Sequence, residues 1–568
     1  MRFSSFCMLG LLASKTQAVL YGDEQFGDLP GRFWAFYSEG IAVIDPESCS
    51  IETTITKDHE GKALPTSWND VVYMQYDNEG TLEGYVMAGS RVDYSNELGE
   101  PVSDAYAISS TDRKVVDTVQ VGPRGVHTYA VWTQDEFWSH SDGDGHFYVV
   151  RLSDLSKHTH KVSAKSEVPA HGKLLWDEDP ATLGNRGFAT STGEQFLFEL
   201  DIATKQQLTK YDYSSDLIPG SGCRGLHAIA YSAINQHLYT ECSGGGGVLE
   251  FDVSNGAIAF VHQHNNATGA LYETPDGSFV VASNKGGDML HVFSPSGSGS
   301  KSSIETEIQV PGHPSTVSFL SNGNAGAGDY IACSPLTENL NQKHRKDGEL
   351  VCDYYVGCTG ATTAEDVEHG ICLHDDGGML LKKVTEALTA DDSPACSRCA
   401  DSANFDDDGA CVCTPSCGSC DPAPTYDDSS SGYMCVDLGA AIAGTVTEAT
   451  LIPNTGGMKQ GKPYGGSADC SFGRTYRTHK RGGIYDASVA SAPENSIHII
   501  NMQTQSKQCE VALPGQPSKV TYAPLQPTKL DAQEGSSMKA SSAKRAHLFF
   551  MSWMMVTVGS MVFTWATW

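Results

Sequence analysis

Histidine recurs in this sequence at one kind of position, the junction between a turn and the apolar strand that follows it. The segments GPRGVHTYAVW, VPAHGKLLW, GCRGLHAIAY and VPGHPSTVSF place His127, His171, His227 and His313 after small or turn-forming residues. Neutral imidazoles are good zinc ligands, with Zn–N distances of about 2.0–2.1 Å. Copper(II) would bind the same set at least as tightly in principle, so the ligand types leave the metal open. These four histidines are the candidate metal ligands.

The spacing of this junction indicates the architecture. Gln516 of LPGQPSKVTY occupies it as a fifth member, and the intervals from His127 onward are 44, 56, 86 and 203 residues. The third interval equals two units of 43, and the fourth, less the 107 residues of 334–440, leaves two units of 48. Repeats in the forties, each with about four short alternating strands, are typical of a β-propeller.

The repeat predicts an all-β protein with eight propeller blades, formed by residues 19–333 and 441–524. Seven blades would result if the blade beside 334–440 were incomplete. The segment SKVTYAP is predicted to supply the inner strand of the blade that FWAFYSEGIAVIDP begins, which would close the ring without a long free sheet edge. Two packed sandwiches are the competing fold, but they do not explain so even a repeat.

The predicted fold would bring the histidines together. The strand after each junction is the innermost strand of a blade, so equivalent residues form a ring around the central channel. His127, His171 and His227 come from three consecutive blades, and His313 from two blades further round. We therefore predict a shared zinc site whose affinity weakens on acidification, because the ligands must be neutral. The alternative is that histidines at these junctions serve only as hydrogen-bonding residues.

Other histidines have simpler explanations. His140 and His146 bracket a glycine-rich loop and His262 flanks a turn, so they are predicted to lie at the surface. We find no nucleophile elbow, phosphate loop or catalytic carboxylate pair, which favours a binding protein over an enzyme.

The two ends of the chain predict export and membrane attachment. Residues 1–18 have the charge, apolar run and small-residue site of a secretory signal peptide. Residues 548–568 form an apolar segment long enough to span a bilayer, and residues 525–547 form a polar linker before it. The small residues around Ser536 fit a GPI attachment site, with a single transmembrane helix as the alternative. Either arrangement places the folded part at the cell surface, and Asn266 lies in a glycosylation motif.

Cysteine usage agrees with an oxidising compartment. Of 17 cysteines, Cys7 lies in the signal peptide, eleven lie from Cys333 to Cys435 and five lie elsewhere. Both groups are odd, so at least one bridge joins them if all are paired. Residues 334–440 are predicted to be an acidic, cysteine-rich, EGF-like insertion stapled by disulfides. Two CxxC pairs within it also match a zinc spacing, which is the less favoured interpretation.

Composition excludes some partners. The chain has 568 residues, with 38 Lys and Arg against 69 Asp and Glu, and a formal net charge of −31. A surface this acidic repels phosphate backbones, which argues against nucleic acid, and it raises the local concentration of cations.

The junction segments also resemble those of a known family. GPRGVHTYAV, AHGKLL and CRGLHAIAYSAINQHLYTEC look like the junctions of bacterial periplasmic zinc metallochaperones, which serve zinc ABC importers. The resemblance implies a propeller with His127, His171 and His227 as ligands and a Cys223–Cys242 disulfide. It covers the propeller only, and this chain has Ala228-Ile229 where a Gly-Glu pair is expected in the family.

Three functions follow as hypotheses. The first is an anchored extracellular protein that captures zinc, or another divalent metal ion, and hands it to a metal importer. The second is a propeller-based hydrolase or oxidoreductase, since a fold does not define a reaction. The third is an interaction scaffold in which the acidic insertion binds a partner.

Overall fold

The computed structural model describes the propeller region of the chain with short gaps. The described residues are 28–79, 81–131, 134–155, 159–163, 172–177, 183–191, 196–213, 225–242, 247–262, 270–284, 289–297, 299–311, 313–314, 316–323, 328–337, 432–453, 475–490 and 495–527, with short strands between 345 and 413. The predicted signal peptide, Asn266, Ser536 and the apolar segment 548–568 lie outside them.

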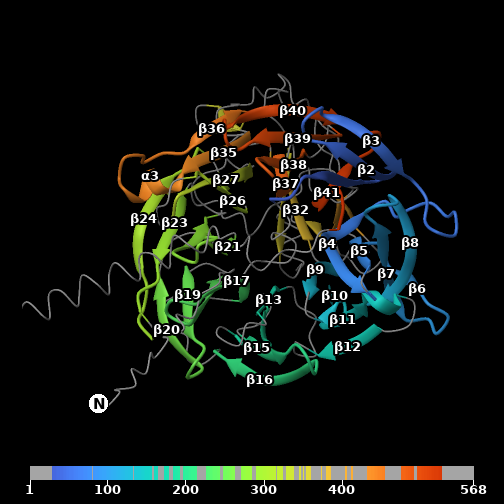
Figure 1. Cartoon of the computed structure of the whole chain (residues 1–568), viewed down its shortest axis with the longest axis horizontal. Coiled ribbons are helices and arrows are strands. Elements are labelled where there is room, and N and C mark those ends of the chain that lie inside the picture. The colour runs from blue at the N-terminus through green and yellow to red at the C-terminus, as the bar shows by residue number, and fades with distance from the viewer. Residues whose placement is uncertain are drawn as a thin grey trace, which may run out of the picture.

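Eight sheets stand in a ring around a common axis, which confirms the eight-bladed propeller, and we call the region around this axis the channel (Figure 1). We number the blades in chain order, starting with the blade that contains both the first and the last strand. From the innermost strand outward, the first three blades are blade 1, with β41 (Pro517–Pro524), β1 (Gly31–Tyr37), β2 (Gly40–Asp45) and β3 (Ser50–Ile55); blade 2, with β4 (Trp68–Asn78), β5 (Thr81–Ser90), β7 (Pro101–Ser109) and β8 (Lys114–Val121), and with β6 (Tyr94–Ser95) beside β7; and blade 3, with β9 (Gly125–Val131), β10 (Glu136–Ser141), β11 (His146–Arg151) and β12 (Thr159–Ser163), and with the 3-10 helix η3 (Leu152–Asp154) after β11.

The next three are blade 4, with β13 (Leu174–Asp177), β14 (Arg186–Thr190), β15 (Phe196–Asp201) and β16 (Gln206–Asp212); blade 5, with β17 (Leu226–Ser232), β18 (His237–Cys242), β19 (Val248–Asp252) and β20 (Ala257–His262); and blade 6, with β21 (Ala270–Glu273), β22 (Val280–Ser283), β23 (Met289–Ser294) and β24 (Ser303–Gln309).

The last two are blade 7, with β25 (His313–Pro314) and β26 (Ser318–Ser321), then β27 (Tyr330–Thr337), β35 (Gly432–Asp437) and β36 (Thr450–Pro453); and blade 8, with β37 (Thr475–Gly482), β38 (Tyr485–Ala490), β39 (Ser496–Asn501) and β40 (Ser506–Ala512).

Burial follows from the way the blades pack. Strands in the middle of a blade are buried on both faces, as in β2, because each blade lies between two others. Outer strands such as β16 are mostly exposed. In the described part of the chain, buried hydrophobic residues form eight clusters, and each cluster joins two neighbouring blades. The core is therefore a ring of interfaces around the channel.

The ring closes as the sequence predicts. β41 pairs antiparallel with β1 over Gly31–Tyr37, so the last strand completes the first blade. A disulfide between Cys49 and Cys509, which are 460 residues apart, joins the outer part of the same blade to blade 8. The ring is thus closed by strand pairing within blade 1 near the channel, and by a covalent bond between blades 1 and 8 near the rim.

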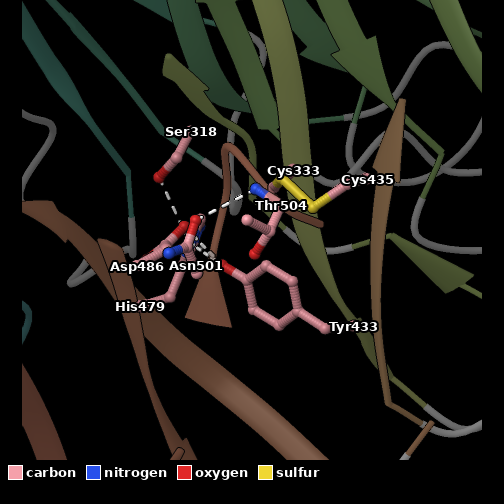
Figure 2. The surroundings of a disulfide bond; sticks show 8 residues. All are labelled: Ser318, Cys333, Tyr433, Cys435, His479, Asp486, Asn501 and Thr504. Carbon is pink, nitrogen blue, oxygen red and sulfur yellow. Dashed lines mark hydrogen bonds and ion pairs between the residues drawn. A yellow bond between two sulfur atoms is a disulfide. The ribbon is translucent and has the colours of Figure 1, made fainter. Parts of the chain in front are cut away.

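Blade 7 contains the insertion, and its limits differ from those predicted. β27 and β35 are neighbouring strands of the blade, and the Cys333–Cys435 disulfide connects them at directly paired positions (Figure 2). Residues 334–337 and 432–437 therefore belong to the propeller, followed by helix α3 (Leu438–Ile442). The interrupting segment is 338–431 and not 334–440. The boundary was predicted from composition, and composition does not show which widely separated segments pair as strands.

The described parts of this segment form two small sheets. Their strands are β28 (Arg345–Lys346) with β29 (Glu349–Leu350), and β30 (Tyr354–Thr359), β31 (Cys372–Leu373), β32 (Met379–Val384), β33 (Ala403–Phe405) and β34 (Cys411–Cys413). Among the described residues, no helix has the length and apolar character needed to cross a bilayer.

A buried histidine in blade 8 should make the fold sensitive to acid. His498 on β39 has a fully buried side chain, and burial, offset in part by Glu510, lowers its pKa to about 4. The unfolded chain takes up this proton near pH 6.5, so stability falls as the pH drops from about 6.5 towards 4. Between pH 7 and pH 5 we expect this group alone to cost about 2 kcal/mol.

The test compares urea denaturation of the wild type and His498→Gln at both pH values. The variant should lose about 2 kcal/mol less than the wild type between pH 7 and pH 5. His59→Gln, at an exposed position, is the matched control and should follow the wild type. An unchanged pH dependence in His498→Gln would contradict the assignment.

Candidate functional site

The inner strands bring five polar side chains to corresponding positions of consecutive blades. They are Lys519 on β41, Asp70 on β4, His127 on β9, Lys173 immediately before β13, and His227 on β17. Asp70, Lys173, His227 and Lys519 are each followed directly by an apolar residue, and His127 is followed by Thr128 and Tyr129. Blades 1 to 5 thus contribute one cation, one carboxylate or one imidazole each.

Asp70 is the centre of this cluster. One of its oxygens, Oδ1, lies 2.5 Å from Lys519 Nζ, and the other, Oδ2, lies 2.5 Å from His127 Nδ1. Lys173 Nζ lies 3.7 Å from the same Oδ2 and 2.9 Å from His127 Nδ1. Burial alone would raise the pKa of Asp70, but attraction to Lys519, His127 and Lys173 holds that pKa well below its usual value. Asp70 is therefore an ionised hydrogen-bond acceptor.

This geometry assigns the tautomer of His127. An ionised carboxylate only accepts hydrogen bonds, so the short contact requires the proton of the imidazole to lie on Nδ1 and to be donated to Asp70. The ammonium of Lys173, which only donates, lies 2.9 Å from the same nitrogen, so it can hydrogen-bond to Nδ1 only in the other tautomer. In the neutral ring, Nε2 is the basic nitrogen, which is the atom that binds a metal when a carboxylate orients Nδ1.

His227 repeats the arrangement with a different carboxylate. Its Nδ1 lies 3.3 Å from Glu241 Oε2, and the same oxygen is 3.3 Å from the backbone N–H of Ala228. Glu241 is buried on β18, directly beside the inner strand. The rings of His127 and His227 have centroids 5.9 Å apart. Two imidazoles from blades 3 and 5 therefore lie next to each other with their ring planes inclined by 51°, each with a carboxylate at Nδ1.

The structure brings together two of the four predicted ligands. His127 and His227 lie side by side, whereas His171 lies outside the described residues. His313 begins β25 of blade 7, two blades after His227, and its side chain is also outside the description. Among the described residues, no three His, Cys, Asp or Glu side chains are placed to hold one metal ion.

Sequence reasoning missed three residues of the cluster, and it also missed Glu241, the carboxylate partner of His227. Asp70, Lys173 and Lys519 precede the apolar residues in NDVVYM, GKLLW and SKVTY just as His127 does in VHTYAV. Aligning the junctions on histidine selected His171 and Gln516 instead, which lie two and three residues earlier. Comparing the polar residues of every type at the start of the inner strands would have included the three. Glu241 lies on the neighbouring strand β18, so no junction pattern indicates it.

The prediction that His140, His146 and His262 lie at the surface is wrong for two of them. His140 and His262 are buried, at 0% and 5% exposure, while the side chain of His146 is about a quarter exposed. His140 lies directly opposite His127 in the sheet, and His262 lies 2.8 Å from the buried carboxylate of Glu250. Their position beside a turn in the sequence did not reveal that neighbouring blades cover them.

A second set of polar side chains joins blades 7 and 8 beside the Cys333–Cys435 disulfide (Figure 2). His479 Nδ1 lies 2.8 Å from Asp486 Oδ2 and 3.3 Å from Ser318 Oγ. A catalytic relay needs the carboxylate and the hydroxyl on opposite nitrogens of the imidazole. Here both contact Nδ1, and the hydroxyl of Tyr433 contacts Nδ1 and Asp486 as well. The set therefore connects blades 7 and 8 and does not have the geometry of a catalytic relay.

The described cysteines agree with an extracytoplasmic compartment. The Cys49–Cys509 and Cys333–Cys435 bridges are present, and Cys242 is disulfide-bonded as well. Cys223, its predicted partner, lies outside the described residues. Disulfides of this kind are typical of oxidising compartments. The predicted bridge between the two cysteine groups stays a prediction.

The fold and the site define an eight-bladed propeller with a polar cluster in its channel. No family model and no curated protein matches the chain. Among solved structures it is similar to AztD from Citrobacter koseri, with 12% identity, a TM-score of 0.41, and coverage of 87% of this chain and 96% of that one. It is also similar to the dihydro-heme d1 dehydrogenase NirN in complex with DHE, with 11% identity, a TM-score of 0.43 and coverage of 89% and 79%.

A third similar structure is the β-propeller domain of Cps50 (Swd1) from Myceliophteria thermophila. It shares 11% identity with a TM-score of 0.37, over 56% of this chain and 93% of that one. Likeness at these identities concerns the fold and not the chemistry of the channel.

Proposed function

We propose that this protein binds zinc in its central channel and acts outside the cytosol as a capture protein that hands zinc to an uptake system. The observation that carries the proposal is the neighbouring pair of imidazoles, His127 and His227, each with a carboxylate at Nδ1. Carboxylates in this position fix the tautomer and raise the basicity of the metal-binding nitrogen.

The order of the blades supports the same site. The two described imidazoles come from blades 3 and 5, and His171 belongs to the intervening junction of blade 4. Three histidines and one open position would suit Zn²⁺. The resemblance implies a Gly-Glu pair after His227 that this chain lacks, and Glu241 supplies a carboxylate to the same imidazole from β18.

The ammonium groups of Lys173 and Lys519 would affect how readily the site releases zinc. Lys173 and Lys519 both form ion pairs with Asp70. Their positive charges balance the negative charge of the carboxylate, which serves to orient His127. Positive charges this close also raise the free energy of a bound cation. A protein that passes its metal on benefits from such a site, because the bound state must not be too stable.

The predicted signal peptide and C-terminal anchor would place the propeller at the cell surface, and the disulfides support an extracytoplasmic location. There the acidic surface would enrich divalent cations near the channel.

The test is to equilibrate the secreted protein with Zn²⁺ and with Cu²⁺, remove free metal, and count bound ions by elemental analysis. We expect one zinc ion per chain at pH 7.5, lost in the His127→Ala, His171→Ala, His227→Ala variant and on acidification to pH 5. A matched triple variant, His59→Ala, His146→Ala and His291→Ala, removes as many histidines outside the cluster and should keep the ion. Equal binding by both variants would refute the proposal.

The enzyme and scaffold hypotheses predict different outcomes. Turnover of an ester or lactone that requires His127 would favour the enzyme. The scaffold hypothesis is tested by deleting the insertion. The deleted segment should be 338–431, because removing 334–440 would also take β35 out of blade 7. Loss of a cellular phenotype with metal binding retained would favour the scaffold.

A further inference from the structure

The second strands of blades 3 and 4 reach across to the inner segment of the following blade. His140 on β10 is the strand neighbour of His127, and its Nδ1 lies 3.2 Å from the carbonyl oxygen of Gly172 in blade 4. Thr190 on β14 donates from Oγ1 to the carbonyl oxygen of His227 in blade 5, at 2.5 Å. In each case a side chain one strand away from the channel fixes the backbone of the next blade's channel segment.

The His140 contact has a defined chemistry. A carbonyl oxygen only accepts, so Nδ1 of His140 carries the proton. The residue is fully buried, its ring centroid lies 4.8 Å from that of Phe147, and it lies 6.5 Å from that of His127. Packing therefore restricts the ring, and the hydrogen bond sets its distance to blade 4.

Gly172 is held from the other side as well. A Cβ at this position would lie 1.9 Å from the carbonyl oxygen of Thr190, so the backbone approaches β14 more closely than any side chain allows. The next backbone N–H, that of Lys173, donates to Thr190 Oγ1 at 2.9 Å. One chain of contacts thus runs from His140 through Gly172 and Lys173 to Thr190 and the backbone of His227.

We propose that His140 is a positioning residue of the channel site, which sets the blade 4 segment that follows His171 against His127 and His227. The inference rests on the proposed function, since it concerns how the backbone of Gly172 and Lys173 is held beside the two described imidazoles. His140 itself is not a ligand, because it acts through the backbone of Gly172.

The test separates the hydrogen bond from the packing. His140→Leu keeps a buried side chain but removes the donor, whereas the side-chain amide of His140→Asn places an N–H close to the position of Nδ1. The measurements are the Zn²⁺ dissociation constant, by competition with a chromophoric chelator, and the visible spectrum of the Co²⁺-loaded protein, which reports the ligand geometry. Removal of a residue that orients a metal ligand typically weakens binding 10–100-fold.

We expect His140→Leu to weaken zinc binding by about that factor and to change the Co²⁺ spectrum, and His140→Asn to restore both. His498→Leu, at a buried histidine of blade 8, is the control for general destabilisation and should leave affinity and spectrum unchanged. Wild-type affinity and spectrum in His140→Leu would overturn this inference alone. Failure of the wild type to bind zinc would overturn the proposed function and this inference with it.

Discussion

Replacing both Cys49 and Cys509 by serine should lower the free energy of unfolding by about 2–5 kcal/mol, the largest loss we expect from any pair of substitutions. The bridge closes a loop of 460 residues, and the entropy that a cross-link removes from the unfolded chain grows with loop length. It also joins blade 8 to blade 1, where the two ends of the ring meet. Thermal and urea denaturation of the secreted protein measure the loss.

The second disulfide provides the comparison. Cys333 and Cys435 are 102 residues apart and link two strands of a single blade. Chain entropy predicts that its removal costs about 1 kcal/mol less than removal of the longer bridge. If the Cys333→Ser, Cys435→Ser variant were the less stable of the two, loop length would not be what determines the contribution of these bridges.

Asp70→Asn should have the second largest effect, with a loss of about 2 kcal/mol in stability at pH 7. Its carboxylate is the shared partner of Lys519, Lys173 and His127, and a neutral amide would leave two ammonium groups close together without an anion. The side chain is about a quarter exposed, so water offsets part of the cost of a fully buried pair. The same variant should weaken zinc binding at least tenfold, because His127 loses its orienting partner.

A double-mutant cycle with Lys519→Met isolates the electrostatic part. Removing one ammonium from Asp70→Asn relieves the repulsion, so the double variant should be more stable than the sum of the single losses predicts. Additive losses would show that Asp70 does not act through Lys519. Lys205→Met, which removes an ammonium paired with Glu136 outside the channel, is the control and should be additive with Asp70→Asn.

The repeat in the sequence was sufficient to predict the fold, but it predicted only part of the candidate site. Turn residues followed by an apolar strand recur because every blade needs the same inner strand, so eight blades and the β41–β1 closure could be predicted. The identity of the channel residue changes from blade to blade, from Asp70 to His127 to Lys173, and a search for histidine alone passes over the others. Contacts such as His140 with Gly172 depend on the rotation between blades, which no local pattern records.

The pairing of β41 with β1 has a consequence for biosynthesis. A ribosome makes Asp70, His127 and His227 long before it makes Lys519, so the nascent chain displays an incomplete cluster and an unpaired β1 edge until the final strand emerges. Open edges of this kind promote association between chains. Premature termination before residue 517 should therefore yield insoluble protein, because β1 would keep its open edge.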